Sequence, residues 1–433
     1  MPARVVIGGQ WGDEGKGRIV DLLARDAHAI VRYSAGNNAG HTVINELGEF
    51  ALHLIPAGIF YSDKVCVIGN GVAVDPAVLI GEIEMLESRG VSTANLVVSD
   101  RAHVIMPYHT IIDRLDEELR GAAAVGTTGR GVGPAFVDKV GRLGLRMADL
   151  IDPAAFAERL RFVLTYKNRV LTQLYGADPL DFDTLRDQYT AYADKLRPYV
   201  RDTSALLRDM LAQGRDVLLE GAQGSLLDLD SGTYDYVTSS VPSSTAAGAA
   251  IGAGISPMAI GEIVGVYKAY MTRVGNGPMP TELLDETGDL LRMGGPRPEV
   301  GTTTGRPRRC GWFDAVVSRH SAAINGVSMA VLTRLDVLDR LPRVFVCTAY
   351  ELDGERVTTP PASASALLRA KPVFEELAGW QQSTAEARSF RQLPRAAQAY
   401  VRRIEELLAT PIRVISVGPE RDQAIFVGER GEP

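Results

Sequence analysis

The chain begins with the stretch Ala3-Arg4-Val5-Val6-Ile7-Gly8-Gly9-Gln10-Trp11-Gly12-Asp13-Glu14-Gly15-Lys16-Gly17-Arg18-Ile19-Val20-Asp21-Leu22-Leu23. The apolar run from Ala3 to Ile7 predicts a buried strand, and the apolar spacing from Ile19 to Leu23 predicts a helix. The glycines between them let several main-chain N–H groups point at one anion. The helix N-terminus and Lys16 add positive charge. These residues therefore predict an α/β fold that starts with a phosphate-binding loop resembling a P-loop.

This loop differs from an ordinary P-loop in its spacing and in its metal ligand. In the ordinary motif four residues separate the first Gly from Gly-Lys, and a Ser or Thr hydroxyl then holds Mg²⁺. Here five residues separate Gly9 from Gly15, and Gly17 stands where the hydroxyl would be. The metal needs another ligand, and Asp13 is the nearest hard oxygen donor. The same carboxylate is placed to act as a base on a substrate beside the γ-phosphate.

The composition excludes several classes of protein. With 433 residues, 45% hydrophobic and 23% charged, the chain has enough apolar residues for a sizeable core. No apolar run approaches the roughly 20 residues that span a bilayer, and the N-terminus enters a strand instead of a signal peptide. We therefore expect a cytoplasmic protein with no membrane partner. The net charge of −7 argues against a nucleic-acid partner. Three scattered cysteines indicate reduced, buried thiols.

Further apolar runs predict strands that alternate with helices. The predicted strands are His28–Tyr33, Lys64–Ile68, Leu96–Ser99, Val217–Leu219, Ile263–Tyr267, Met329–Leu332, Val344–Ala349, Ile412–Ser416 and Ala424–Val427. The predicted helices are Pro76–Arg89, Tyr108–Arg120, Pro153–Tyr175, Phe182–Gln213, Trp312–Asn325 and Pro394–Ala409. Continuous apolar strands are typical of a sheet covered on both faces, so we expect one domain, 1–433, around a mostly parallel central sheet. We also expect a helical insertion at 150–213 and long functional loops at 121–145, 221–260 and 273–311.

A second polar stretch follows the strand predicted at 28–33. It reads Ser34-Ala35-Gly36-Asn37-Asn38-Ala39-Gly40-His41-Thr42. Two consecutive amides suit the edges of a base or a phosphate, and His41 can carry a proton near neutral pH. Small residues around His41 leave the backbone open to a ligand. We expect the other histidines to be structural, namely His28, His53, His103, His109 and His320.

The stretch Thr333-Arg334-Leu335-Asp336 resembles the Asn-Lys-x-Asp element with which GTPases read guanine. A carboxylate accepts hydrogen bonds from guanine N1–H and the 2-amino group, which adenine lacks. Taken alone, the pattern fits a helix cap at Asp336 equally well. Together with a phosphate loop it favours a guanine nucleotide.

Across essentially its whole length the chain resembles the adenylosuccinate synthetase family. Seven stretches carry this resemblance: 10–17, 38–42, 126–131, 220–224, 233–240, 268–280 and 301–312. It implies a ligase that joins L-aspartate to IMP with GTP and one Mg²⁺ per subunit, by way of 6-phosphoryl-IMP. The products would be adenylosuccinate, GDP and phosphate, on the route to AMP. The resemblance also implies a cytoplasmic homodimer.

The resemblance implies a role for particular residues. Asp13 would be the base at purine N1 and His41 its acid partner, with Gln223 near the O6 edge; Asp13 and the Gly40 carbonyl would bind the metal. The IMP site would comprise Asp13, Lys16, Asn38, His41, Thr128, Gln223, Thr238, Arg306 and an Arg142 reaching from the neighbouring subunit. The GTP site would comprise Gly12, Glu14, Gly15, Lys16, Gly17, Gly40, Thr42, Arg308, Arg334, Leu335, Asp336, Ser416 and Gly418. The aspartate site would comprise Thr302, Thr303, Thr304, Arg306 and Arg308.

Two positions depart from the family, and two other functions stay open. Arg334 stands where the family usually has Lys, although its planar group can still stack on guanine. Pro307 stands where some relatives have a further Arg. One alternative is a related enzyme that amidates another purine nucleotide or uses another phosphoryl donor; Asp13 and Asp336 argue against it. The other is a GTP-binding regulatory switch, which would have no use for a second ligand loop at 301–309.

Overall fold

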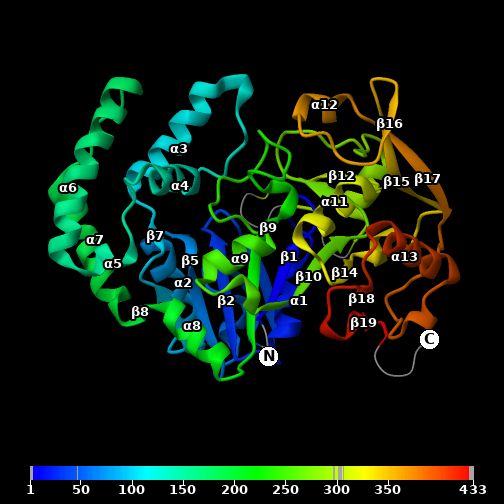
Figure 1. Cartoon of the computed structure of the whole chain (residues 1–433), viewed down its shortest axis with the longest axis horizontal. Helices are drawn as coiled ribbons and strands as arrows, with labels where there is room; N and C mark the ends of the chain where they lie inside the picture. The colour runs from blue at the N-terminus through cyan, green and yellow to red at the C-terminus, as the bar shows by residue number, and fades with distance from the viewer. Residues whose placement is uncertain (1–2, 46, 296–297, 301–304, 306, 429–433) are drawn as a thin grey trace. The chain divides into compact units, whose positions relative to one another are not determined.

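The computed structural model describes residues 3–45, 47–295, 298–300, 305 and 307–428 (Figure 1). The chain groups into two compact units. Unit 1 comprises Met1–Arg4, Leu23–Ala222 and Thr238–Gly261, and unit 2 comprises Val5–Leu22, Gln223–Val237 and Glu262–Pro433.

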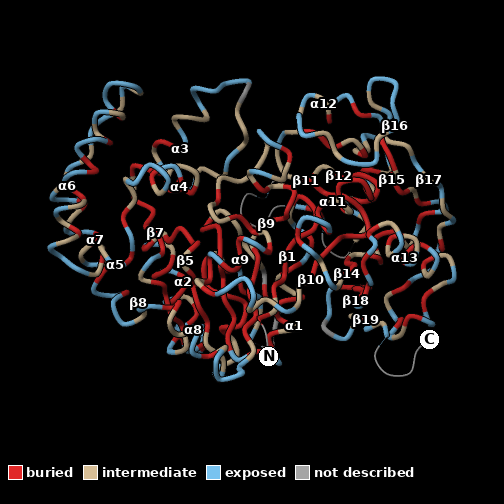
Figure 2. The backbone as a smooth tube through the Cα atoms, viewed as in Figure 1, coloured by how far each residue is buried: buried red, intermediate tan, exposed pale blue. Residues whose placement is uncertain are grey.

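Unit 1 is built on a parallel sheet. Its strands are β2 (Ala29–Ala35), β5 (Val65–Val74), β6 (Leu96–Ser99), β7 (His103–Val104), β8 (Val200–Arg201) and β9 (Val217–Gly224). They lie in the order β9-β2-β5-β6-β8, with β7 also on β5, and these pairings are parallel. β2 is buried along its whole length, as its continuous apolar character predicts (Figure 2). The parallel sheet predicted from the sequence is confirmed here.

Helices of unit 1 cover this sheet and extend beyond it. They are α2 (Pro76–Ser88), α3 (Pro107–Arg120), α4 (Val132–Gly141), α5 (Met147–Ile151), α6 (Pro153–Arg169), α7 (Phe182–Leu196), α8 (Thr203–Ala212) and α9 (Ala246–Ala253). α9 packs on β2 and β5, α8 packs on β5 and β6, and α5, α6 and α7 pack on one another. α2 begins at Pro76 because the Asp75 carboxylate accepts hydrogen bonds from the N–H groups of the first turn.

The prediction of one helix over Phe182–Gln213 is wrong. α7 ends at Leu196, a 3₁₀ turn containing Pro198 follows, and β8 pairs with β6 before α8 begins. Proline cannot continue the hydrogen bonding of a helix, and the Asp202 side chain caps α8 afresh. The region 150–213 is otherwise helical, as expected.

The three stretches predicted as long loops each contain a helix. α4 lies in 121–145, α9 lies in 221–260 and α10 (Glu286–Met293) lies in 273–311. α9 reads AAGAAIGA and contains no polar residue, so it has no polar face from which helical periodicity could be recognised, although six of its eight residues are buried. The prediction from glycine and threonine content therefore overestimated the length of these loops.

Unit 2 is likewise built on mostly parallel strands. Its strands are β1 (Ala3–Gly8), β10 (Ile260–Lys268), β14 (Met329–Thr333), β18 (Ile412–Ser416) and β19 (Ala424–Phe426), in the order β19-β18-β14-β10-β1. β14 pairs in parallel with β10 and β18, and β19 is antiparallel to β18. α1 (Lys16–Ala24) follows β1 after the glycine-rich loop. The predicted order of strand, loop and helix is confirmed.

Smaller sheets complete the chain. In unit 2, β15 (Arg343–Leu352) pairs with β13 (Phe313–Asp314), β16 (Glu355–Val357) and β17 (Lys371–Ala378), and α11 (Ala315–Asn325) and α13 (Arg395–Leu408) pack beside them. The helix predicted from Trp312 begins at Ala315, because β13 pairs with β15 and Asp314 caps α11. β11 (Met271–Arg273) pairs with β12 (Arg309–Gly311). In unit 1, β3 (His41–Asn45) and β4 (Gly48–Leu52) form an antiparallel hairpin.

Candidate active site

The glycine-rich loop of unit 2 is folded around the buried carboxylate of Glu14. This carboxylate accepts hydrogen bonds from the N–H groups of Gln10 (3.0 Å) and Gly12 (2.9 Å) and from Lys16 Nζ (2.6 Å). Burial alone would raise the pKa of Glu14, but the attraction of Lys16 and these hydrogen bonds lower it. Gly12 and Gly15 have φ values of 91° and 86°, which favour glycine. The Glu14 side chain thus shapes the loop and neutralises Lys16.

Asp13 points away from this internal network. Its φ of 60° is rare for a residue with a side chain, and its carboxylate is 35% exposed. Its partner is Arg308 Nε, with which it forms a salt bridge. The loop therefore presents one accessible carboxylate, held by an arginine from the segment that follows residues 301–306.

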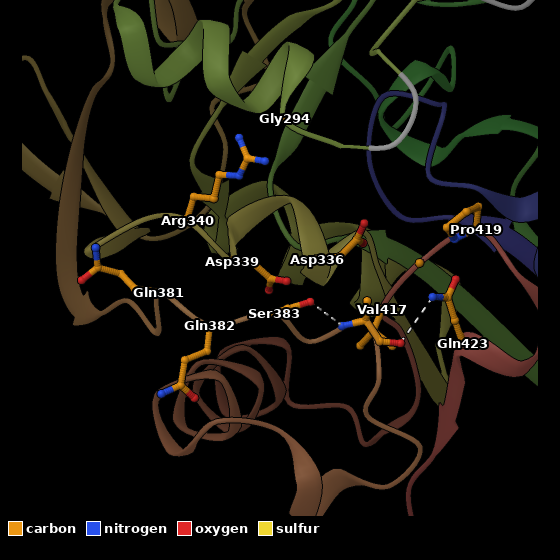
Figure 3. A pocket seen from close by; sticks show the side chains of 12 residues that line it. Gly294, Asp336, Asp339, Arg340, Gln381, Gln382, Ser383, Val417, Pro419 and Gln423 are labelled. Carbon is orange, nitrogen blue, oxygen red and sulfur yellow. Dashed lines mark hydrogen bonds between the residues drawn. The ribbon is translucent and has the colours of Figure 1, made fainter.

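Part of the predicted GTP site lines a pocket of about 650 Å³ in unit 2, whereas Arg334, Leu335 and Ser416 are not among the residues that line it (Figure 3). Asp336 and Gly418 are among its lining residues, together with Arg340, Gln381 and Gln423. Asp336 Oδ1 is buried and has no hydrogen-bond partner among the described residues. Burial raises the pKa of Asp336. A buried acceptor without a donor beside a pocket of this size indicates a ligand that supplies N–H groups.

Two further residues hold the walls of this pocket. Asp339 accepts hydrogen bonds from Trp380 Nε1 (2.7 Å), Thr384 N (2.7 Å) and Thr384 Oγ1 (2.9 Å). Arg18 donates to Ser416 Oγ and to the carbonyl oxygens of Gly418 and Glu420. The first set positions the segment 380–384 and the second positions the turn after β18.

Arg334 follows β14 in the left-handed region, with φ 62°. Its guanidinium donates to Glu299 Oε1 from Nη2 (2.8 Å) and Nε (3.2 Å). Glu299 also accepts from Lys268 Nζ (2.7 Å). Burial alone would raise the pKa of Glu299, but Lys268 and Arg334 together lower it to about 2. Arg334 is therefore fixed by a buried carboxylate.

In unit 1, His41 lies at the start of β3 beside Glu220 on β9. The distance from His41 Nδ1 to Glu220 Oε1 is 3.4 Å, and Arg32 Nη1 donates to the same oxygen at 2.9 Å. Burial lowers the pKa of His41 to about 4, although Glu220 opposes this effect. His41 is therefore neutral near pH 7. Neither ring nitrogen has a hydrogen-bond partner within the described part of the chain.

Other predicted residues of unit 1 lie outside its helices and strands. Asn38 follows β2, and its buried Oδ1 has no hydrogen-bond partner among the residues that the structure describes. Thr238 Oγ1 lies 3.3 Å from Ser240 Oγ. The stretch before Thr128 is held by Glu117 of α3, which accepts from the N–H groups of 125, 126 and 127. Free acceptors and fixed backbone at these positions suit a polar ligand.

Arg142 ends α4 with φ 62°, and its side chain is exposed. Its carbonyl oxygen accepts a hydrogen bond from Arg159 of α6. The backbone is thus held while the guanidinium is left at the surface of the chain.

The structure divides the predicted site residues between the two units. Unit 2 holds Gly12, Asp13, Glu14, Gly15, Lys16, Gly17, Gln223, Arg308, Arg334, Leu335, Asp336, Ser416 and Gly418. Unit 1 holds Asn38, Gly40, His41, Thr42, Thr128, Arg142 and Thr238. Thr302, Thr303, Thr304 and Arg306 lie outside the described residues. In unit 2 the structure brings Asp13 together with Arg308, Glu14 with Lys16, and Asp336 with Gly418.

Sequence reasoning missed the residues that position these groups. Glu220 sits 188 residues from Arg32, and Glu299 sits 35 residues from Arg334. Arg18 and Asp339 lie within a few residues of predicted positions, but nothing local marks them. Arg32 within β2 and Glu220 within β9 could have been recognised by one signal, which is a charged residue inside an otherwise apolar, buried strand.

The residues present fit a magnesium ion only in part. Among the described residues no group of three or more His, Cys, Asp or Glu side chains could hold a metal. Mg²⁺ keeps several waters and is usually held by one or two carboxylates plus substrate phosphates. One accessible carboxylate on a phosphate loop, Asp13, matches that requirement.

None of the helices in the described ranges is long and apolar enough to cross a membrane. The three cysteines Cys66, Cys310 and Cys347 are free and buried.

Comparison with known proteins identifies the family. The family model for adenylosuccinate synthetase matches residues 5–425. The adenylosuccinate synthetase of Heliobacterium modesticaldum is 53% identical over 429 residues, which cover 99% of this chain and 100% of that protein. The fully ligated adenylosuccinate synthetase of Plasmodium falciparum superposes with a TM-score of 0.92 at 36% identity, covering 99% and 100% of the two chains.

A more distant structure shares the fold. The succinoaminodeoxyadenylate synthetase of cyanophage S-2L, bound to dGMP and to dATP as energy donor, has a TM-score of 0.61 at 22% identity, with 99% of this chain and 96% of that chain covered. The mixed α/β fold with its mostly parallel sheet thus matches synthetases of this kind. The chain belongs to the adenylosuccinate synthetase family, whose members are ligases that form a carbon–nitrogen bond.

Proposed function

We propose that this chain joins L-aspartate to IMP with GTP, by way of 6-phosphoryl-IMP, and releases adenylosuccinate, GDP and phosphate. The observation that carries the proposal is the accessible carboxylate of Asp13 on a phosphate loop. A loop that only binds phosphate needs donors and positive charge, and an exposed carboxylate there would repel the ligand. A carboxylate that removes a proton and binds a metal is useful at that position.

In the first step Asp13 removes the N1 proton of IMP, and the negative charge gathers on O6. O6 then attacks the γ-phosphorus of GTP, and GDP leaves. Lys16 would leave Glu14 to bind the phosphates, while Gln223 would bind the O6 edge. His41, neutral because of its burial, would donate a hydrogen bond to the transferring phosphoryl group.

In the second step the aspartate amine attacks C6 and phosphate leaves as the C6–O6 bond breaks. The departing phosphate is a far better leaving group than the original oxygen. Arg308 and Arg306 would bind the carboxylates of aspartate through their planar forks. Thr302, Thr303 and Thr304 would add hydroxyl donors. Asn38, Thr128, Thr238 and the 5′-phosphate ligand Arg142 would hold IMP.

We propose that the pocket beside Asp336 takes the guanine base. Asp336 Oδ1 would accept from guanine N1–H or its 2-amino group, which would supply the donor it lacks. Arg334 would cover the face of the base, with Leu335 beside it. Ser416 and Gly418 would form the opposite wall. Gly12, Gly15, Gly17 and the main chain of Glu14 would face the phosphates, with Gly40 and Thr42 completing the site.

One Mg²⁺ per subunit would be held by Asp13 and the Gly40 carbonyl. When bound, it neutralises charge on the phosphates during transfer. Asp13 would exchange Arg308 for the metal, which leaves Arg308 for substrate.

We also propose that residues 1–433 act as one catalytic domain in a cytoplasmic homodimer. Neither unit alone carries the full set of residues. The three free, buried thiols suit a reducing compartment. Arg142, exposed at the end of α4, would serve the partner's IMP site.

The test is to mix the protein with GTP, IMP, L-aspartate and Mg²⁺ and to follow adenylosuccinate by its absorbance and GDP by chromatography. We expect both products in equal amounts. ATP in place of GTP, dGMP in place of IMP, and EDTA in place of Mg²⁺ should each reduce product formation at least tenfold. GDP release without adenylosuccinate would indicate a GTPase instead, and equal rates with dGMP and ATP would indicate the other purine-amidating activity.

A further inference from the structure

Glu299 contacts two segments of unit 2 that the proposed function assigns to different substrates. Its side chain is 5% exposed and accepts hydrogen bonds from Lys268 Nζ (2.7 Å), Tyr270 OH (2.5 Å) and Arg334 Nη2 (2.8 Å). Arg334 belongs to the base-reading element. The buried carboxylate of Glu299 therefore fixes the position of the Arg334 guanidinium.

The main chain of Glu299 is bonded to the other segment. Its carbonyl oxygen accepts a hydrogen bond from the N–H of Arg308 at 2.8 Å, and its own N–H donates to the carbonyl of Arg292 at 2.8 Å. The next residues, Val300 and Pro307, form an isolated antiparallel bridge. Glu299 thus lies at the joined ends of the segment 301–306, which the proposed function assigns to aspartate.

The second link leads to the reacting groups. The side chain of Arg308 forms a salt bridge with Asp13 on the phosphate loop. Two contacts, one through the side chain of Glu299 and one through its main chain, therefore connect Arg334 with Arg308.

We propose that Glu299 couples the guanine-nucleotide site to the aspartate site, so that each ligand raises the affinity for the other. The proposal rests on the function proposed above. Glu299 is a positioning residue, since it reaches the substrates only through the two arginines.

The physical basis is shared ordering. A guanine base stacked on Arg334 holds the guanidinium plane and with it the carboxylate of Glu299. An aspartate held by Arg308 fixes the main chain at the same residue. The second ligand then binds to a residue whose conformational freedom is already reduced, which gives positive coupling. Arginine suits this role because its planar fork gives Glu299 two N–H donors, whereas lysine offers one nitrogen on a flexible stem.

The experiment measures coupling at equilibrium and needs no turnover. The Kd of GDP is measured by calorimetry with IMP and Mg²⁺ present, first without and then with saturating L-aspartate. The ratio of the two values is the coupling factor, and reciprocity makes it equal to the factor by which GDP tightens aspartate. For the unmodified protein we expect a factor of about 5 or more.

Three variants locate the coupling. Glu299→Gln removes the charge and should lower the factor below about 2. Arg334→Lys keeps the positive charge and should give an intermediate factor. The double variant should be no lower than Glu299→Gln alone, because both changes break one link. Glu375→Gln is the matched control, since Arg403 donates to the Glu375 carboxylate at 2.8–3.0 Å elsewhere in unit 2, and it should keep the full factor.

Folding is checked by the thermal unfolding midpoint. If Glu299→Gln unfolds because Lys268 and Arg334 lose their counter-charge, Arg334→Lys decides alone. A coupling factor near 1 in the unmodified protein, or an undiminished factor in Arg334→Lys or a folded Glu299→Gln, would overturn the proposal. Coupled binding without adenylosuccinate formation would refute the proposed reaction and leave the role of Glu299 intact.

Discussion

Three acidic residues of the nucleotide region have different roles because their surroundings differ. Glu14 is buried and saturated with donors, so it shapes the phosphate loop. Asp13, one residue earlier, is exposed and available for chemistry. Asp336 Oδ1 is buried without a hydrogen-bond partner in the described residues and requires a donor from a ligand. A carboxylate's role here follows from its hydrogen-bond count and burial.

Replacing Asp13 with Ala should abolish turnover and leave the fold intact. The change removes both a base and a metal ligand, which should lower kcat by roughly three orders of magnitude or more. It also removes an exposed side chain that contributes little to the core, so the unfolding midpoint should stay within a few degrees. Steady-state kinetics and thermal unfolding are measured side by side. Retention of more than a tenth of the activity would show that Asp13 has another role.

Replacing Asp336 with Asn should weaken GTP and improve XTP. Xanthine carries a carbonyl where guanine carries its 2-amino group, and the new amide can donate to it. The ratio of kcat/KM for XTP over GTP should rise by about 100-fold. Both nucleotides are assayed at fixed IMP and aspartate, with Ser383→Ala at the rim of the pocket as control. An unchanged KM for GTP would remove Asp336 from the base site.

At the scale of elements, most strands of the large sheet were predictable because continuous apolar runs are a local signal, whereas the two-residue strands β7 and β8 were not predicted. The hairpin of β3 and β4 and the strands β13, β16 and β17 that pair with β15 were not predicted, because none of these segments is a continuous apolar run. α9 was missed because all of its residues are small or apolar, which leaves no amphipathic pattern. Helices and strands that are stabilised mainly by residues distant in the sequence have no local pattern from which they could be predicted.

The start of α11 gives a test of stability at this scale. Asp314 caps the helix and is buried, and burial raises its pKa from 3.8 to about 6, although the Tyr350 hydroxyl opposes the rise. The folded state therefore binds the proton more tightly than the unfolded state. The contribution of Asp314 protonation to the free energy of unfolding is fully present below pH 3.8 and is lost as the pH rises through about 6.

Asp314→Asn should remove this pH dependence, because asparagine caps the helix without a charge. The unfolding midpoint of the unmodified protein should fall relative to that of the variant between pH 5 and pH 7, by an amount worth roughly 1 kcal/mol. Thermal unfolding of both proteins over this range is the measurement. Parallel pH profiles would show that Asp314 is ionised throughout.

At the scale of the whole molecule, the residues that we propose for one reaction are divided between both units, and we propose that Arg142 serves a second subunit. The phosphate loop and base pocket belong to unit 2, whereas His41 and Arg142 belong to unit 1. These residues were predicted from motifs in the sequence. The motifs did not identify Glu220 or Glu299, because their partners are set by the fold. Family membership is a property of the whole chain, matched from residue 5 to residue 425.

Mixing two inactive variants should restore activity if Arg142 acts in the partner subunit. Arg142→Leu and Asp13→Ala subunits each lack one function. A mixed dimer then carries one site with both defects and one site with neither. With equal random exchange, activity should approach a quarter of the unmodified level, because half of the dimers are mixed. Subunit exchange is verified by mass spectrometry of differently tagged subunits. If the subunits exchange and no activity returns, Arg142 acts in the active site of its own subunit or in no active site.

The salt bridge between Asp13 and Arg308 has a consequence for the cell's use of GTP. The carboxylate of Asp13 is occupied by the Arg308 guanidinium and is therefore not free to accept a hydrogen bond from a stray water molecule, so nucleotide bound alone should be cleaved slowly. Arg308 is expected to leave Asp13 when the other substrates bind. The salt bridge between Asp13 and Arg308 would thus suppress hydrolysis of GTP in the absence of the other substrates. GTP would be consumed only when IMP and aspartate are bound.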